Sequence, residues 1–303
     1  MKNCFLAGLF VLFFVLLVAR PNVSSADFRE RLPANGMFVE QEFLALEIET
    51  FDISVAVSIY GGKEIFIAYP ESDDVNYFLY DFDFSSGTLK LTQSDFHNFE
   101  AGTLKVFIPV WEREFNYINI KTVSGSANLD SFISRNDVRV ETDSGSIEAS
   151  GLVMIGVLDL STVSGAINVD AIISARDIFL KSVSGTLNAN DAQASNIQLH
   201  SNSGFLSANG LVGAIAAMSP LGDIRIKDVV GSVNLASTSG AINANELAGS
   251  AIINARSSSV LLQNSILSGA RIINHSGFVT LENVKINEED LLINTVSGTI
   301  KIN

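Results

Sequence analysis

The phrase Thr122-Val-Ser-Gly125 returns as Thr142-Asp-Ser-Gly145, Thr162-Val-Ser-Gly165 and Ser182-Val-Ser-Gly185. Later copies are looser, but each keeps a small residue at the last position. The glycines that we assign to this turn are Gly125, Gly145, Gly165, Gly185, Gly204, Gly222, Gly240, Gly277 and Gly298. They recur every 18 to 21 residues, with Ser258 standing in once. Self-similarity at this period is typical of proteins built by stacking one short structural unit.

Apolar residues hold fixed places around each turn glycine. In the first copy they are Ile118, Ile120, Ala127 and Leu129, and the same template still fits the last copy. This alternation predicts two short strands per copy, each with one apolar face. One copy cannot bury such faces alone, so neighbouring copies must stack in register. We predict an all-β fold, a parallel β-solenoid (β-helix) of about ten rungs over residues 118–303. Leucine-rich repeats have a similar period, but their signature is absent.

The turn itself has a chemical interpretation. Glycine at each corner suggests a backbone with positive φ, and the serine before it can hydrogen-bond its own turn. The paired hydroxyls, such as Thr122 and Ser124, would form a column along the solenoid. We interpret this column as satisfying turn amides and not as an ice-binding array.

Residues 43–117 differ in composition from the repeat. All five tyrosines and the single tryptophan of the chain lie at or before Tyr117. Alternation such as Phe51, Ile53, Val55 predicts ordinary β-strands, which follow an irregular leader at 27–42. We expect this aromatic-rich region to cap the first rung, because a solenoid end is a row of unpaired strand groups. The alternative is a ligand contact through four aromatic residues, Tyr77, Tyr80, Trp111 and Tyr117.

The chain begins with Lys2, an apolar run from Phe5 to Ala19, and small residues at Ser24-Ser25-Ala26. This pattern predicts a signal peptide at 1–26, cleaved after Ala26. The apolar run is shorter than the roughly 20 residues that span a bilayer, which disfavours a retained anchor. The only cysteine, Cys4, would leave with the signal. We therefore expect a secreted, periplasmic or cell-surface protein with no integral membrane segment after cleavage.

Charge and motifs limit the function classes. The formal net charge of −14 makes the protein acidic and disfavours nucleic-acid partners. His97, His200 and His275 are far apart in sequence, and no nucleophile elbow, phosphate-binding loop or zinc-protease motif occurs. The acidic clusters Asp73-Asp74 and Glu288-Glu289-Asp290 lack the glycine-rich pattern of calcium-binding β-rolls. We expect no catalytic residues, metal or cofactor. Asn274-His-Ser276 matches a glycosylation sequon.

One run of residues resembles a known family. Leu104-Lys-Val-Phe-Ile-Pro109 is followed by Ile118-Asn-Ile-Lys-Thr-Val-Ser-Gly125 and by repeated Ser-Gly phrases. This arrangement, over roughly 43–303, resembles the bacterial putative adhesin domain family of unknown function, related to the head domains of putative autotransporter adhesins. The resemblance implies a secreted or surface-associated β-solenoid.

We expect an exported, non-enzymatic binding or scaffolding protein of the cell envelope or extracellular space, with an envelope polymer, surface polymer or protein as partner. One alternative is a carbohydrate-active β-helix enzyme, a polysaccharide lyase or hydrolase, because such enzymes also use solenoids. Another is a passive structural spacer. The terminal strand at 298–303 is an expected site of self-association by strand addition.

Overall fold

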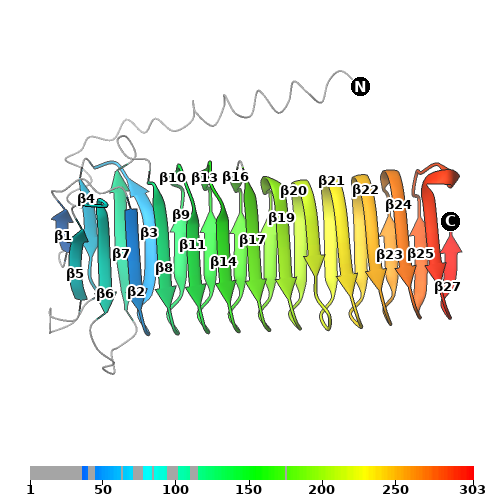
Figure 1. Cartoon of the computed structure of the whole chain (residues 1–303), viewed down its shortest axis with the longest axis horizontal. Coiled ribbons are helices and arrows are strands. Elements are labelled where there is room, and N and C mark those ends of the chain that lie inside the picture. The colour runs from blue at the N-terminus through cyan, green and yellow to red at the C-terminus, as the bar shows by residue number, and fades with distance from the viewer. Residues whose placement is uncertain are drawn as a thin grey trace, which may run out of the picture.

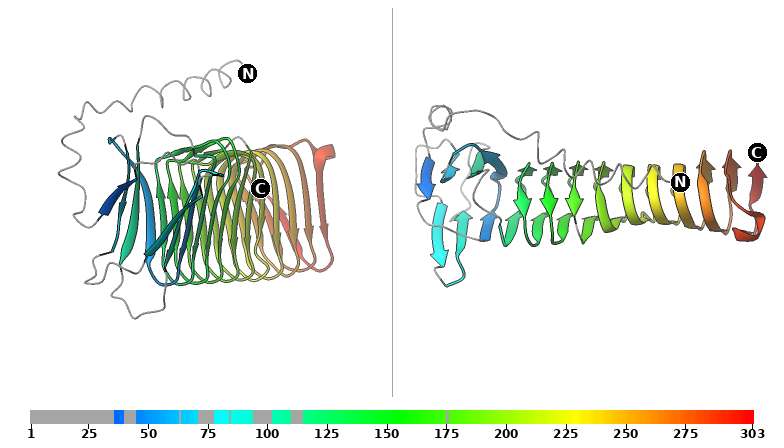
Figure 2. Two further views of the ribbon diagram at one scale, coloured as in Figure 1. Left: turned by 60° about the vertical axis from the view of Figure 1, so that its left-hand side comes forward. Right: turned by 90° about the horizontal axis from the view of Figure 1, so that it is seen from above.

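The computed structural model describes residues 36–39, 45–62, 64–70, 78–83, 85–93, 102–109, 115–174 and 176–303. These residues form one long stack of β-strands, with the N-terminal strands at one end and β27 at the other (Figures 1 and 2). The predicted all-β parallel solenoid is confirmed. In the described ranges the only helical element is the short 3-10 helix η2 (Glu288–Asp290). None of the described residues forms a helix long and apolar enough to cross a membrane.

Each early turn of the solenoid has three sides. The first-side strands are β8 (Tyr117–Thr122), β11 (Val138–Thr142), β14 (Leu158–Thr162) and β17 (Asp177–Ser182). The second-side strands are β9 (Ala127–Asp130), β12 (Ile147–Ser150), β15 (Ile167–Asp170) and β18 (Leu187–Asn190). The short third-side strands, along the upper edge in Figure 1, are β10 (Ile133–Ser134), β13 (Val153–Met154) and β16 (Ile173–Ser174).

Strands of the later turns run across two sides at once. The merged strands are β19 (Gln193–Ser201), β20 (Leu206–Met218), β21 (Ile224–Ser237), β22 (Ile242–Ala255) and β24 (Ile266–Asn274). The remaining strands are β23 (Val260–Gln263), β25 (Phe278–Glu282), β26 (Leu291–Thr295) and β27 (Thr299–Ile302). β27 pairs with β25. The self-association expected at this strand stays a prediction.

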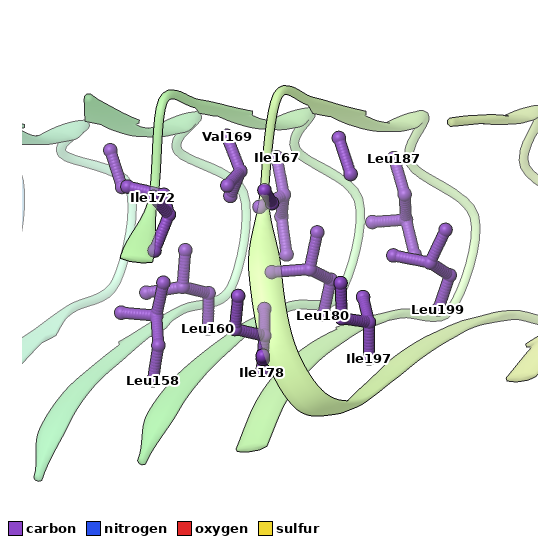
Figure 3. Packing of buried hydrophobic residues seen from close by; sticks show 14 of the residues in the cluster. Leu158, Leu160, Ile167, Val169, Ile172, Ile178, Leu180, Leu187, Ile197 and Leu199 are labelled. Carbon is purple, nitrogen blue, oxygen red and sulfur yellow. The ribbon is translucent and has the colours of Figure 1, made fainter. Parts of the chain in front are cut away.

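Equivalent residues of successive turns stack directly on one another. Thr122, Thr142 and Thr162 are paired in register, as are Ile118, Val138 and Leu158. The apolar residues of the first and second sides face each other inside the coil and are almost fully buried (Figure 3). Burial of each such leucine or isoleucine contributes about 1.5–3 kcal/mol. Stacking in register therefore buries the apolar faces that the sequence pattern predicts.

The N-terminal strands extend the same stack in a different chain order. β2 (Ala45–Thr50) lies parallel between β8 and β6 (Thr88–Gln93), and β3 (Ser54–Tyr60) lies parallel between β9 and β7 (Thr103–Pro109). Hydrogen bonding thus continues across residue 118, where the sequence predicts a regional boundary. The spatial order is β6–β7, then β2–β3, then β8–β9.

Antiparallel strands close the N-terminal end of this stack. β5 (Phe78–Asp83) pairs with β6, β4 (Ile65–Ala68) pairs with β7, and β1 (Gly36–Val39) pairs with β4. The reversed strand direction ends the parallel repeat, so the next layer cannot be another identical turn. Such an end is protected against open-ended strand addition.

The turn glycines correct one prediction. Of the nine, only Gly277 has a positive φ, so the expected left-handed corner is wrong for the other eight. Their glycine identity has a different cause. A Cβ built on Gly145 would meet the carbonyl oxygen of Gly125 far inside van der Waals contact, and a Cβ on Gly165 would meet that of Gly145 in the same way. The turns stack too closely for a side chain.

A left-handed corner lies six residues after each turn position from Gly125 to Gly277, including Ser258. The residues there have φ between +47° and +66° and are Ser131, Gly151, Ala171, Asp191, Gly210, Asp228, Glu246, Asn264 and Asn283. The column contains two glycines and seven other residues, so no single amino-acid type marks it in the sequence. A residue other than glycine costs about 1–2 kcal/mol in this left-handed conformation, and Asn and Asp cost less.

Candidate binding surface

The first hydroxyl of each turn phrase is a structural group. Thr122, Thr142 and Thr162 are buried, and each Oγ1 accepts the N–H of the glycine three residues later, at 3.1, 2.9 and 3.0 Å. The hydroxyls therefore satisfy turn amides, as predicted. The serine before the glycine behaves differently from the prediction, because the Ser124 hydroxyl donates to the preceding turn, to the carbonyl of Phe51, at 3.3 Å.

This hydroxyl column is interrupted at two adjacent turns, by Ala255 and by Asn274. Ala255 carries no hydroxyl and Ser258 replaces the turn glycine. Three buried side-chain atoms near this break have no hydrogen-bond partner: Ser237 Oγ, Ser258 Oγ and Asn274 Oδ1. A hollow of about 330 Å³ opens beside it, lined in part by Ala255, Arg256 and His275. We interpret the hollow as a packing fault of the column.

The sequon at Asn274 lies in the same place. The Asn274 side chain is fully buried, and its Nδ2 donates to the carbonyl of Ser258 at 3.0 Å. Glycosylation needs an accessible amide nitrogen, so the folded protein does not present this asparagine for modification.

Titratable residues are dispersed over the described surface. His200 lies in β19, His275 follows β24, and His97 is outside the described residues. Across the described ranges, no three His, Cys, Asp or Glu side chains come together as metal ligands. Glu288, Glu289 and Asp290 are exposed on η2, and Asp73-Asp74 lies outside the described residues.

Two of the four aromatic residues predicted as ligand contacts lie among the described residues. Tyr80 lies in β5, whereas Tyr77 and Trp111 lie outside the described residues. Tyr117, at the start of β8, donates its hydroxyl to Glu47 Oε1 at 2.8 Å. Burial raises the pKa of Tyr117 above its usual value, with smaller contributions from Glu47. This tyrosine thus joins β8 to β2, which gives it a structural role at the start of the repeat.

The turns of the solenoid change size along the stack. Between the third and first sides, Arg135, Asn136 and Asp137 separate Ser134 from Val138. At the same corner of a later turn only Ala214 separates Gly213 from Ile215. Single residues also form the corners of the next two turns, at Ser232 and Ser250. Three consecutive turns are therefore two residues shorter at one corner.

A groove lies over these shortened turns. It is formed on β19 to β22, and Figure 1 shows where these strands lie in the stack. Its volume is about 210 Å³. We call it the waist groove and define it by its lining residues, Asn196, Gln198, Ala214, Ile215, Ala216, Ser232, Val233, Asn234, Ser250 and Ile252. Missing corner residues and small side chains together explain the hollow.

The waist groove is uncharged in an acidic protein. Its side chains are amides, hydroxyls and apolar groups, with no Asp, Glu, Lys or Arg among them. The first side before the groove is charged, with ion pairs between Lys121 and Glu141 at 3.8 Å and between Lys181 and Asp159 at 3.2 Å. One carboxylate touches the rim, because Asn196 Nδ2 donates to Asp177 Oδ1 at 2.6 Å. The groove therefore offers neutral hydrogen-bonding groups over small apolar residues.

A row of stacked residues crosses the groove along the solenoid axis. Strand pairing places Phe179, Gln198, Ala216, Asn234 and Ile252 side by side on five successive strands. Phe179 and Ile252 are the apolar ends of this row, and Ala216 is its smallest member. The Lys181 ammonium lies 5.1 Å from the Phe179 ring centroid.

An apolar stripe on the third side borders the waist groove. Its outward residues stack in register from turn to turn and are Ile133, Val153, Ile173, Gln193, Val212, Val230, Ala248 and Ile266. Ile133, Val212, Val230 and Ile266 are 42% to 64% exposed. Val212 and Val230 precede the groove residues Ala214 and Ser232 by two positions.

Sequence reasoning missed both the groove and the stripe. The groove had a readable signal, because the glycine period falls from 20 residues at Gly185 to 18 at Gly222 and Gly240. The stripe had almost no signal in the sequence, because strands β10, β13 and β16 are two residues long and show no alternation of apolar and polar residues.

The fold and surface define a three-sided parallel β-solenoid with an uncharged groove on one flank. Residues 153–257, about a third of the chain, match the Toastrack family DUF4097. This match confirms the resemblance to a solenoid family of unknown function. The matched segment contains the whole waist groove.

Two solved structures match the chain at low sequence identity. A putative adhesin from Bacteroides fragilis is 18% identical with a TM-score of 0.35, covering 88% of this chain and 96% of that chain. A putative cell adhesion protein from Clostridium sporogenes is 8% identical with a TM-score of 0.23, covering 88% and 97%. No curated protein matches this chain.

Proposed function

We propose that this chain is an exported, non-enzymatic binding protein of the cell envelope or extracellular space, with the waist groove as its binding site. One observation carries the proposal: three shortened turns create a neutral, hydrogen-bonding hollow on a rigid stack. Ligand sites are generally concave, with few polar groups placed among apolar ones. The groove has this composition.

Rigidity supports a binding role. Groove residues stand on long strands that pair residue by residue from Ile224 to Ser237 with Ile242 to Ala255. Side chains on such strands are held about 4.8 Å apart across the stack. When a site is already ordered, little free energy is spent on ordering its side chains as the ligand binds.

A polysaccharide-cleaving enzyme is the main rival. Glycoside hydrolases place two carboxylates about 5–9.5 Å apart around the scissile bond. The groove lining contains no carboxylate, and Asp177 at its rim is engaged by Asn196. This composition favours binding over cleavage. A passive spacer, the other alternative, would give the groove no function.

The export part of the proposal rests on the signal-peptide pattern at residues 1–26. Expression of the complete chain in a bacterial host, followed by N-terminal sequencing of the product, tests it directly. A mature protein that begins at Asp27 and is found outside the cytoplasm is expected. Retention of Met1 in the cytoplasm would contradict it.

The binding part is tested with residues 27–303 on a panel of immobilised envelope polymers, glycans and matrix proteins. Both retained protein and released sugar are measured. We expect saturable retention without released sugar. Released sugar would support the enzyme, and retention that is absent throughout would support the spacer.

A further inference from the structure

We infer that the waist groove binds a linear, uncharged oligosaccharide of about four sugar units that lies along the solenoid axis. The inference rests on the proposed function and adds the chemical class and direction of the ligand. It is argued from the lining groups, their spacing and the charge around them.

The lining groups match neutral sugars. Asn196, Gln198 and Asn234 carry side-chain amides, each with two N–H donors and an acceptor oxygen. Ser232 and Ser250 add hydroxyls that both donate and accept. Neighbouring hydroxyls of a sugar ring need this mixture, because each of them also donates and accepts. The hydrogen bond from Asn196 to Asp177 holds one of these amides in a fixed position.

Apolar residues supply the second requirement of sugar binding. A pyranose ring has C–H groups on its faces, and these pack on aromatic or aliphatic side chains. Phe179 is partly exposed on the strand next to Gln198 and provides a ring just beyond one end of the groove, with Lys181 Nζ 5.1 Å from its centroid. Ile252, 45% exposed, provides an aliphatic group at the other end. The small side chains of Ala214 and Ala216 leave room for sugar rings in the groove.

The direction and length of the ligand follow from the strand order. The row from Phe179 to Ile252 spans four strand spacings, about 19 Å. One strand spacing is close to the length of one sugar unit, so a chain along the axis would meet an equivalent position on each turn. The ligand is expected to lie across the strands, with about one unit per turn.

The surrounding charge selects against acidic chains. The protein carries a formal charge of −14, and the carboxylate of Asp177 lies at the groove rim. No lysine or arginine is among the lining residues, and the nearest cations lie beyond the two ends, Lys181 at the Phe179 ring and Arg271 on the strand next to Ile252. An anionic polymer would therefore be repelled by the acidic protein as a whole and would find no cationic partner among the lining residues of the groove.

Isothermal titration calorimetry on residues 27–303 tests the inference. The probes are cellotetraose, chitotetraose, maltotetraose and mannotetraose, the matching disaccharides, and tetragalacturonate as the charged comparison. We expect at least one neutral tetrasaccharide to bind saturably, about tenfold more tightly than its disaccharide, and tetragalacturonate not to bind. Failure of all four neutral tetrasaccharides, or preference for tetragalacturonate, would overturn it.

A matched pair of variants locates the site. Ala216→Gln puts into the groove the side chain that Gln198 already has on the neighbouring turn, so the variant should fold. Ser207→Gln makes a similar addition on the second side, away from the groove. We expect Ala216→Gln to weaken tetrasaccharide binding at least tenfold and Ser207→Gln to leave it unchanged. Equal binding by both variants would overturn the assignment.

The ligand class and the binding role can fail separately. If Ala216→Gln abolishes retention on a protein or acidic polymer while no neutral sugar binds, the groove is a binding site and the sugar inference is wrong. If Ala216→Gln leaves retention on every polymer unchanged, the groove is not the binding site and both proposals fall.

Discussion

The Thr142 hydroxyl accepts the Gly145 amide at 2.9 Å, and the same bond forms in most other turns, including Thr122 with Gly125 and Thr295 with Gly298. It satisfies the backbone N–H of the turn glycine. Thr142→Val keeps the size of the side chain and removes the acceptor. We expect a loss of about 1–3 kcal/mol in the free energy of unfolding, because the amide is left buried without a partner. Urea denaturation measures it.

Thr142→Ser is the control for this prediction, because serine already makes the bond at Ser182 and Ser201. It should cost much less than Thr142→Val. Equal losses for the two variants would mean that packing of the methyl group, and not the hydrogen bond, determines the effect.

Two glycine variants separate crowding from backbone conformation. Gly145 has no positive φ, but its Cβ would strike the Gly125 carbonyl, whereas Gly151 has φ of +64° and its Cβ would meet a side-chain oxygen at 2.9 Å. We expect Gly145→Ala to be destabilised by more than about 3 kcal/mol, since backbone must move. Gly151→Ala should lose only about 1–2 kcal/mol. Thermal unfolding compares them, and the reverse order would contradict the close-stacking explanation.

The left-handed corner offers a stabilising substitution. Ala171 has φ of +51°, which is unfavourable for alanine. Ala171→Gly should raise the free energy of unfolding by about 0.5–1 kcal/mol, after the entropy that glycine loses on folding. The matched control is Ala241→Gly, where φ is not positive and only the entropy loss remains. A loss of stability at both positions would contradict the prediction.

The break in the hydroxyl column can be repaired. Ala255 occupies the place that a threonine or serine holds in most other turns, beside unpaired Ser237 and Asn274 oxygens. Ala255→Ser returns a hydroxyl to this place and should stabilise the protein by about 0.5–1.5 kcal/mol. Calorimetric unfolding checks the sign. A destabilised variant would show that the hollow is not a packing fault.

One carboxyl gives a pH prediction. Hydrogen bonds from Ser86 and Ser85 lower the pKa of Asp83 to about 2 from 3.8. A lowered folded-state pKa means that the β5–β6 turn is favoured above pH 3.8 and loses this contribution as the pH falls toward 2. NMR titration should find the low value, and Ser86→Ala should move the pKa of Asp83 upward. No change in the variant would exclude Ser86 as the main cause.

The repeat made most of the fold predictable, because Ile118, Val138 and Leu158 recur at one place in the pattern and stack in register. The reason for glycine was not predictable, since close contact between Gly125 and Gly145 depends on how tightly turns stack. The position of β2–β3 between β6–β7 and β8–β9 was also not predictable, because parallel pairing of strands far apart in sequence leaves no local sequence pattern.

The binding surface was the least predictable part. A groove depends on which residues are missing, here at the corners near Ala214 and Ser232, and motif searches look for residues that are present. The aromatic residues that the sequence suggested as ligand contacts include Tyr117. Its hydroxyl donates a hydrogen bond to Glu47, so it has a structural role. Chemistry without charge or nucleophiles leaves little trace in a single sequence.

The measurement that tests the central claim most directly is retention of residues 27–303 on the polymer panel, compared among the unaltered protein, Ala216→Gln and Ser207→Gln. The account predicts saturable retention on at least one polymer, its loss with Ala216→Gln, and its persistence with Ser207→Gln. Retention that survives Ala216→Gln, with all three proteins equally folded by circular dichroism, would contradict the claim that the waist groove is the binding site.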